Sequence, residues 1–298
     1  MLKEMKMIVV TGITGQVGGV VARTLLAAGK PVRAVVRDAA KGAPWAAQGC
    51  KVAVADMADA AALAAAFAGA QAVFVLLPPD FDPDPADPAS ARQIAALRSA
   101  LDQAQPERVV CLSTIGAQAS EPNLLSQLGR LERALGELAM PLALLRAAWF
   151  IENFAWDVAL ARTTGCLSSY LQPLDQPVPM VACADVGRAA AELLSCAPWQ
   201  GRRVVELEGP QRLSPHDVAA GFARVLGRAV SAKAVPRARW AEQFVAQGMR
   251  HPQPRMRMLD GFNEGWICFE GAAAGAEPRR GEVGLDSVLA QLIVRQPG

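Results

Sequence analysis

Residues 7–18 read MIVVTGITGQVG, and this stretch decides the fold. Its apolar start predicts a short buried strand, and the helical spacing of apolar residues over 18–28 predicts a helix directly after it. The glycines between them follow the pattern G-x-x-G-x-x-G. Gly12 permits a tight turn, Gly15 lets the backbone approach a pyrophosphate, and Gly18 lets the helix pack closely on the strand. The stretch therefore predicts a dinucleotide-binding turn that opens a βαβ unit.

The residues of this turn are the first candidate cofactor ligands. A helix N-terminus presents free N–H groups and a partial positive charge to phosphates. The alternative is an ordinary strand–helix turn that happens to be rich in glycine. We expect cofactor contacts from six residues: Gly12, Thr14, Gly15, Gln16, Val17 and Gly18.

Beyond the turn, short apolar runs alternate with helical segments. Continuously apolar strands separated by helices predict a parallel sheet covered on both faces, and right-handed crossovers make it doubly wound. We therefore expect an α/β fold with a Rossmann-type doubly wound parallel sheet and a smaller C-terminal substrate lobe. The expected strands are 7–11, 32–36, 52–55, 72–77, 109–112 and 142–145, and the expected helices are 18–28, 59–67, 89–103 and 124–138.

The expected boundary between the two parts falls near residue 150. Residues 1–150 form the NAD(P)-binding domain, which 181–208 complete with a helix capped by Asp185 and a strand over 203–207. Residues 151–298 form the smaller substrate-binding lobe, with a helix capped by Ser214. The run PPDFDPDP over 78–85 predicts a mobile loop after the fourth strand.

The end of the second strand bears on the choice of cofactor. An NAD site usually places an acidic residue there, but this chain has Arg37 followed by Asp38. A guanidinium can pair bidentately with the 2′-phosphate of NADP, with Arg33 nearby and Lys41 beyond. The sequence favours NADP(H), while Asp38 leaves NAD(H) open and Arg37 could instead be a solvated charge.

Other candidate cofactor residues follow the later strands, since ligands bind outside the carboxyl ends of a parallel sheet. Asp56 and Met57 end the third strand, beside the expected adenine, although Asp56 could simply cap the next turn. Leu77 and Pro78 end the fourth strand along the expected ribose. Ser113 ends the fifth strand and faces the expected nicotinamide.

Composition narrows the classes of partner. The 298 residues carry 30 basic and 28 acidic side chains, a net charge of +2, which gives no field that would attract nucleic acid or an anionic membrane. No C-x-x-C pair occurs among six scattered cysteines, and with two histidines we expect no metal site. No apolar run approaches the length of a membrane span. We expect a cytoplasmic protein that does not bind membranes.

Several segments resemble the atypical short-chain dehydrogenase/reductase superfamily and, within it, the NmrA-like group, which includes NADPH-dependent quinone oxidoreductases. The glycine turn and the run VRAVVR over 32–37 carry the wider resemblance. The run LLRAAWFIENF over 144–154 and the run VACADVGRAAA over 181–191 resemble motifs of the narrower group. The resemblance implies that Trp149, Phe150 and Asn153 line the substrate pocket beside the nicotinamide. Alternatively, the two aromatic residues belong to the core.

The resemblance also raises the question of chemistry, because reductases of the wider superfamily use a Tyr-x-x-x-Lys pair. The only tyrosine here is Tyr170, with Leu174 four residues on, and no lysine lies between the fifth and sixth strands. Reduction of an ordinary ketone makes an alkoxide that needs a positioned acid. A quinone makes a phenolate-like anion, with a pKa of about 10, which water can protonate. The catalytic residues are therefore unknown, although Arg130 or Arg133 could stabilise charge.

Two functions remain open from the sequence. One is an NAD(P)H-dependent oxidoreductase for a quinone or a similar electron-poor acceptor. The other is a non-catalytic NADP(H)-sensing regulatory protein, which the missing tyrosine–lysine pair fits equally well. Large apolar residues in the C-terminal part could form a hydrophobic surface that covers the nicotinamide. They could equally belong to the core or to a contact between subunits, so a homodimer is possible. These residues are Trp240, Phe244, Phe262 and Trp266.

Overall fold

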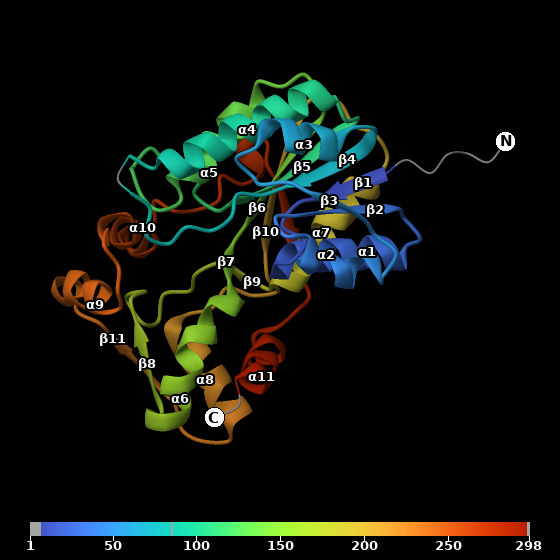
Figure 1. Cartoon of the computed structure of the whole chain (residues 1–298). Helices are drawn as coiled ribbons and strands as arrows, with labels where there is room; N and C mark the ends of the chain where they lie inside the picture. Colours follow the sequence, from blue (N-terminus) through green and yellow to red (C-terminus); the bar gives the residue numbers. More distant parts are fainter. Residues whose placement is uncertain (1–6, 85, 297–298) are drawn as a thin grey trace.

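The computed structural model describes residues 7–84 and 86–296. Its main sheet has eight strands in the spatial order β12-β10-β6-β5-β4-β1-β2-β3 (Figure 1). Every neighbouring pair in it is parallel, which confirms the predicted doubly wound fold. The strands are β1 (Met7–Val10), β2 (Val32–Val36), β3 (Lys51–Val54), β4 (Ala70–Val75), β5 (Arg108–Thr114), β6 (Leu142–Ala147), β10 (Arg202–Glu208) and β12 (Glu277–Arg280).

Helices cover both faces of this sheet, as the apolar strands require. One face packs against α1 (Gln16–Ala27), α2 (Ala39–Ala46) and α7 (Cys183–Ser195). The other face packs against α3 (Ala60–Phe67), α4 (Pro88–Ala104) and α5 (Ser126–Gly136). The strand order reverses between β1 and β4, so a crevice opens at the carboxyl ends of these two strands.

Local sequence signals explain where three of these six helices, α2, α3 and α4, begin. Asp59 caps α3, within the helix expected over 59–67, because its side chain accepts a hydrogen bond from the Ala62 N–H at 2.9 Å. The prediction that Asp185 caps a helix is wrong. The helix α7 begins at Cys183, with Ala182 at the N-cap. Asp185 lies buried in its first turn and accepts from the Val283 N–H at 2.9 Å.

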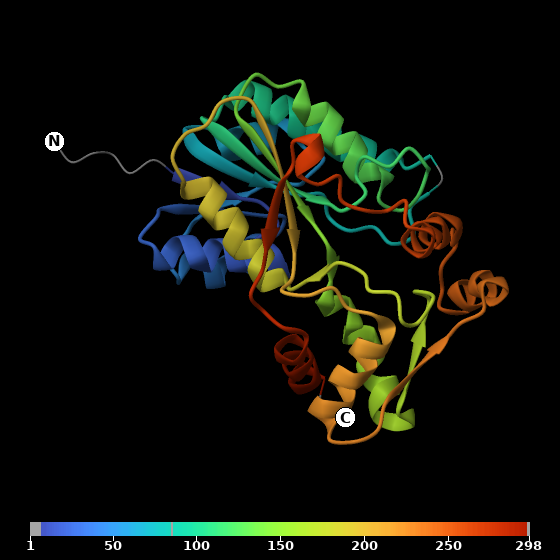
Figure 2. The same ribbon diagram turned by 180° about the vertical axis from the view of Figure 1, so that it is seen from behind.

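The chain returns to the sheet twice after β6. The predicted strand at 203–207 is β10, which pairs with β6. A second return was not predicted: β12 pairs with β10 and forms an edge of the sheet (Figure 2). The sequence of β12 is EPRR, which has no apolar run to mark it as a strand.

The remaining segments form a smaller lobe below the sheet in Figure 1. Ser214 caps α8 as predicted, in a capping box with Asp217. Trp240 and Phe244 are 1% and 0% exposed, so they belong to the core of the lobe. The elements of the lobe are β7 (Trp149–Phe150), η1 (Ile151–Asp157), α6 (Val158–Thr164), β8 (Cys166–Ser169), β9 (Met180–Val181), α8 (Pro215–Leu226), β11 (Ser231–Ala234), η2 (Arg237–Arg239), α9 (Trp240–Ala246), α10 (Gln253–Glu264) and α11 (Leu285–Arg295). The short helix η3 (Ala272–Ala274) lies beside the sheet and leads into β12.

Within the described ranges, no helix is long and apolar enough to cross a bilayer. The same part of the chain contains no cluster of three or more His, Cys, Asp or Glu side chains that could hold a metal ion. The six cysteines are free thiols, and they lie at separate places in the fold.

Candidate active site

The turn between β1 and α1 has the geometry of a phosphate cradle. Gly12 has a φ of +60°, the left-handed conformation that glycine adopts without strain. A Cβ on Gly18 would lie 2.3 Å from the Gly12 carbonyl oxygen, so only glycine lets the helix approach the turn. No side chain caps α1, and the first N–H groups of a helix have no partner within it.

The outer surface of this turn is open to a ligand. Thr14, Gly15 and Gln16 are exposed, while Val17 is buried against the sheet. A Cβ on Gly15 would meet only the Gly12 carbonyl oxygen, at 3.3 Å, so a diphosphate could lie against the Gly15 backbone. These residues fit the phosphates of a dinucleotide, because the backbone is accessible and the first N–H groups of the helix can donate to phosphate oxygens. The positive end of the helix dipole also attracts their charge.

The end of β2 places one free cation beside this turn. Arg37 is exposed and forms no hydrogen bond or ion pair with any residue that the structure describes. Asp38 accepts a hydrogen bond from the Ala40 N–H at 2.9 Å and caps α2, so its carboxylate is already engaged. Arg33 does not join Arg37, since its guanidinium donates to the carbonyl oxygens of Ala66 and Ala68 at 2.6 and 2.9 Å.

Most of the candidate residues that follow β3 and β4 are buried or cap a turn, and one is partly exposed. Asp56 accepts from the Ala58 N–H at 2.9 Å, which is the turn-capping alternative, and Met57 is buried. Leu77 is 7% exposed and packs toward α3 and α4, whereas Pro78 is partly exposed. The side chain that meets the glycine turn is Leu76, whose Cδ2 would lie 2.8 Å from a Cβ on Gly12.

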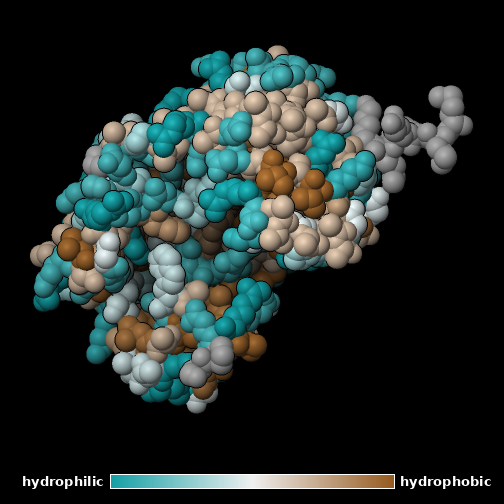
Figure 3. Space-filling view, in the orientation of Figure 1, coloured by the Kyte–Doolittle hydropathy of each residue, from teal (hydrophilic) through white to brown (hydrophobic). Residues whose placement is uncertain are grey.

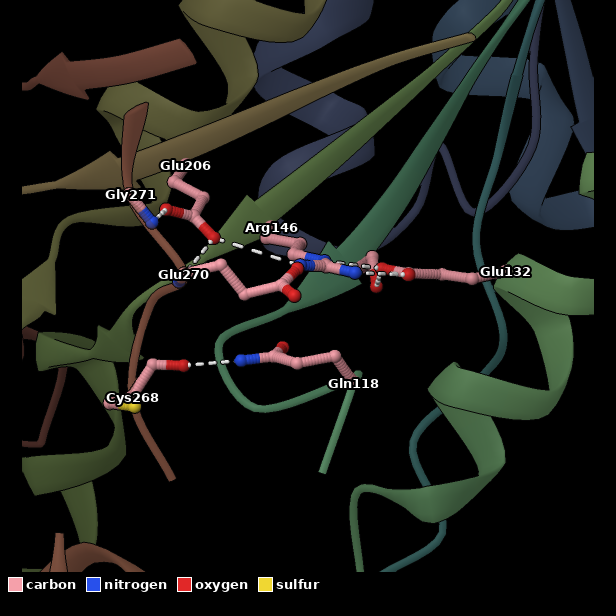
Figure 4. A network of polar contacts seen from close by, with 8 residues as sticks. Gln118, Glu132, Arg146, Glu206, Cys268, Glu270 and Gly271 are labelled. Atoms are coloured by element: carbon pink, nitrogen blue, oxygen red, sulfur yellow. Dashed lines mark hydrogen bonds and ion pairs between the residues drawn. The ribbon is translucent and has the colours of Figure 1, made fainter. Parts of the chain in front are cut away.

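Ser113, expected to face the nicotinamide, is buried and donates to the Glu132 carboxylate at 2.5 Å. Glu132 also binds Arg146 of β6 through two hydrogen bonds, of 2.9 and 2.7 Å (Figure 4). Burial by itself would lower the pKa of Arg146, but Glu132 and Glu270 outweigh it and raise that pKa. The guanidinium is therefore a permanent cation that ties α5 to β6.

The same network fixes the segment that follows α10. Glu206 of β10 lies 3.6 Å from Arg146 and accepts from the N–H groups of Glu270 and Gly271, both at 2.9 Å (Figure 4). Gln118 donates to the Cys268 carbonyl oxygen at 2.7 Å. This segment of the C-terminal part is thereby held against the carboxyl ends of β5 and β6.

The two arginines considered for charge stabilisation point elsewhere. Arg130 forms an ion pair with Asp87 at the start of α4 and a hydrogen bond of 2.8 Å with Ser90. Arg133 is exposed on α5. Within the described residues, neither side chain forms a hydrogen bond or ion pair with the glycine turn or with Trp149, Phe150 or Asn153.

The predicted acceptor residues lie where the chain leaves β6 for the lobe. Trp149 contacts Phe262 of α10 edge-on, with ring centroids 5.3 Å apart, and packs on the core of the lobe. Phe150 packs on the α1–α7 side of the sheet. Asn153 lies in η1 and is partly exposed. Trp149 and Phe150 thus have the core contacts of the alternative interpretation, at the border of the crevice.

A neighbouring acid holds these residues in place. Glu152 accepts from the Cys183 N–H at 2.9 Å and so binds the first turn of α7. Burial raises the pKa of Glu152 and also raises the pKa of the Cys183 thiol beside it. This hydrogen bond joins η1 to the α/β body.

The loop after β4, predicted to be mobile, is tied to the lobe. Asp82 accepts hydrogen bonds from the N–H groups of Arg250 and His251 at 2.9 and 2.7 Å. Phe81 meets Trp156 of η1 edge-on, with ring centroids 5.5 Å apart. Residue 85 of the predicted loop lies outside the described residues. Sequence reasoning missed these contacts because their partners are distant in the chain.

A hollow separates the α/β body from the lobe in the space-filling view (Figure 3). It lies toward the carboxyl ends of the strands, where the glycine turn and the predicted acceptor residues are found. A separate groove of about 690 Å³ runs between α4 and α5. None of the predicted cofactor or acceptor residues lines that groove.

Comparison with known proteins agrees with this fold. The model of the family described as NmrA-like matches residues 4–258. The chain is 29% identical over 245 residues to an NAD(P)H azoreductase of Xenophilus azovorans. It is 27% identical over 245 residues to quinone oxidoreductase 2 of Escherichia coli. Each comparison covers 82% of this chain and 82% of the relative. The NADPH complex of an Escherichia coli NADPH-dependent quinone oxidoreductase superposes with a TM-score of 0.71 at 25% identity, covering 96% of this chain and 94% of the other.

Proposed function

This chain belongs to the NmrA-like family, and on that premise we propose that it is an oxidoreductase that passes hydride from NADPH to a quinone or a similar electron-poor acceptor. The observation that carries the proposal is the open turn at Gly15, where uncapped N–H groups of α1 face the crevice. The named relatives, an azoreductase and a quinone oxidoreductase, support the same class of reaction.

The proposed cofactor preference rests on the end of β2. Arg37 is exposed and unpaired among the described residues, so its guanidinium is available to a 2′-phosphate. Asp38, which could have held the ribose hydroxyls of NAD, is engaged in capping α2. These two observations support NADP(H) over NAD(H).

The proposed hydride transfer requires the protein mainly to hold the cofactor and the acceptor close together. A bound dihydronicotinamide would supply the hydride. The helix between β5 and β6 has Arg130, Glu132 and Arg133 where a tyrosine–lysine pair would lie, and two of these are held in ion pairs. An acceptor whose reduced anion water can protonate suits such a site, because proximity and an apolar slot supply the rate enhancement.

The residues proposed to hold the acceptor are Trp149, Phe150 and Asn153, at the start of the lobe. The aromatic rings would exclude water and lie against a planar ring, and the Asn153 amide can donate to a carbonyl oxygen. Glu152 and the Arg146 network position this segment, since they tie η1 to α7 and β6 to α5.

A steady-state assay tests the proposal. Purified protein should oxidise NADPH when a small neutral naphthoquinone is added, one NADPH for each quinone reduced, and NADH should be a poorer donor. If NADPH binds but no quinone or azo compound is reduced, the proposal fails and a dinucleotide-sensing function takes its place.

A further inference from the structure

A small cavity of about 100 Å³ lies beside the glycine turn, where the α/β body meets the lobe. Gln16, the first residue of α1, belongs both to the turn and to the lining of this cavity. Glu152 of η1 and Cys183, the first residue of α7, line it as well. The lobe contributes one face of α11, which includes Arg295. The cavity therefore joins the last helix of the chain to the proposed phosphate site.

The proposed phosphate site has no cationic side chain of its own. Residues 12–18 read GITGQVG, and none of them is charged. The dipole of α1 supplies a positive charge of only about one half at its N-terminus, whereas a diphosphate carries two negative charges. The proposed function assigns Arg37 to the 2′-phosphate. A further cation beside the turn would add to binding, because charge-assisted hydrogen bonds to phosphate are strong.

Two arginines line the cavity, and they differ in their distance from the turn. Arg23 lies seven residues after Gln16 on α1, which at about 1.5 Å per residue places it about 10 Å along the helix. Its guanidinium carbon lies 5.8 Å from the centroid of the Trp45 ring. Arg295 is exposed and forms no hydrogen bond or ion pair with any residue that the structure describes. Of the two, Arg295 is the cation available to a ligand.

Glu152 indicates the end of the cavity near which Arg295 lies. Its carboxylate accepts the Cys183 N–H at 2.9 Å, so it lies at the N-terminus of α7. Burial raises the pKa of Glu152, and the charge of Arg295 opposes that shift, so the two groups are close. The guanidinium has five N–H donors and no acceptor, which lets Arg295 face both Glu152 and a phosphate. Glu152 would then orient Arg295.

The end of α11 that bears Arg295 is fixed to its neighbours. Arg162 of α6 donates to the carbonyl oxygens of Ile293, at 2.6 Å, and of Gln296. The Gln296 amide donates to the Ala155 carbonyl oxygen of η1 at 3.1 Å. The backbone at Arg295 is therefore already ordered, and only its side chain has to be immobilised when a ligand binds, which keeps the entropic cost low.

We propose that Arg295 binds the diphosphate of the dinucleotide from the side of the lobe, so that the cofactor joins α11 to the glycine turn. The inference rests on the proposed function and adds a cofactor-binding residue from the C-terminal helix to it. The contact would also couple cofactor binding to the docking of the lobe on the α/β body.

Calorimetric titration with three ligands tests the contact. NADP⁺ and NAD⁺ both contain the diphosphate, and adenosine 2′-monophosphate does not. Arg295→Met should weaken NADP⁺ and NAD⁺ by the same factor, about tenfold, as expected for one charge-assisted contact. It should leave adenosine 2′-monophosphate unchanged. Arg295→Lys should retain part of the affinity, and thermal unfolding without ligand should match the wild type in both variants, since Arg295 forms no ion pair.

Arg23→Met is the matched control, because it removes an equal charge from the same cavity at a place remote from the turn. It should bind all three ligands like the wild type. Unchanged NADP⁺ affinity in Arg295→Met, or an equal loss in Arg23→Met, overturns the inference. If the wild type binds neither dinucleotide, the proposed function itself fails, and this outcome is distinct from the other two.

Hydrogen exchange gives a second readout that does not depend on affinity. With NADP⁺ at saturation, peptides from α11 should exchange more slowly in the wild type, because the cofactor then holds this helix to the body. The same protection should be lost in Arg295→Met at saturating NADP⁺ and kept in Arg23→Met. Equal protection of α11 in all three proteins would contradict the proposed coupling.

Discussion

At the scale of single residues, the arginines are distinguished by their partners. Arg33 donates to the carbonyl oxygens at the end of α3, Arg130 pairs with Asp87, and Arg146 pairs with Glu132. Arg37 is exposed and forms no hydrogen bond or ion pair with any described residue. The sequence predicted a role for Arg37 from its place after a strand. The sequence could not show that Arg33 has a different role from Arg37, because the partners of the Arg33 side chain lie at the end of α3.

Replacement of Arg37 by Ala should weaken NADPH binding by about tenfold to a hundredfold, because a charge-assisted phosphate contact contributes roughly 1.5–3 kcal/mol. NADH binding should change little, since NADH lacks the 2′-phosphate. Fluorescence titration of both cofactors measures the two losses. Arg33→Ala is the control and should lower stability with no effect on cofactor choice. Equal losses for the two cofactors would refute the assigned role of Arg37.

The buried carboxyl of Asp157 makes stability depend on pH. Its pKa is raised from 3.8 to about 6 by burial. As pH rises through this interval, the unfolded chain releases its proton before the folded chain does, so the wild type loses stability. Asp157→Asn should lessen the slope, to which the raised pKa of Glu152 also contributes, and be about 2 kcal/mol more stable than the wild type near pH 8. Urea unfolding at several pH values measures this.

The control for that experiment is Asp175→Asn, in the same lobe but exposed. Its unfolding free energy should follow the pH dependence of the wild type. A slope as steep in Asp157→Asn as in the wild type would show that Asp157 does not cause it.

At the scale of elements, the glycines of the first turn have separable tasks. A Cβ on Gly18 would lie 2.3 Å from a backbone oxygen of Gly12, while one on Gly15 would have its nearest neighbour at 3.3 Å. Gly18→Ala should therefore cost about 2–3 kcal/mol of stability. Gly15→Ala should fold with almost unchanged stability yet weaken NADPH binding, because its methyl group lies where the diphosphate would bind.

Thermal unfolding and calorimetric titration of the two variants separate these effects. If Gly15→Ala binds NADPH as tightly as the wild type, the phosphates do not lie against this turn.

The elements that the sequence predicted share one property. The sheet strands from β1 to β6 are short apolar runs bounded by turn residues, and Asp59 and Ser214 mark helix starts with a local hydrogen bond. The predicted start of α7 was wrong because the Asp185 side chain does not cap its own helix. It accepts a hydrogen bond from the distant N–H group of Val283 instead. β12 was missed because an edge strand needs no apolar face.

At the scale of the whole molecule, contacts across the hollow tie the lobe to the body. Asp82 joins the loop after β4 to the segment before α10, and Glu206 joins β10 to the segment after it. These pairs are separated by 168 and 64 residues in the chain. Local patterns in the sequence carry no sign of them, so the contacts of the loop after β4 with the lobe could not be predicted.

Asp82→Ala should release this anchor. The N–H groups of Arg250 and His251 would lose their acceptor, so we expect their hydrogen exchange to quicken by about tenfold or more, with a stability loss of about 1 kcal/mol. Hydrogen exchange followed by mass spectrometry of peptides that span 249–252 measures it. Asp84→Ala is the control, because Asp84 accepts only within its own loop, from Ala86. Equal exchange in both variants would mean that the loop is not held by Asp82.

The central claim is that a nicotinamide held at the carboxyl edge of this sheet gives its hydride to an electron-poor acceptor in the hollow. Single-turnover mixing tests it most directly: protein loaded with one equivalent of NADPH is mixed with excess quinone without oxygen. We predict that the nicotinamide absorbance decays in one phase and that deuterium at the transferred position of C4 slows this decay. Bound NADPH that persists in the presence of quinone, with no isotope-sensitive phase, would contradict the account.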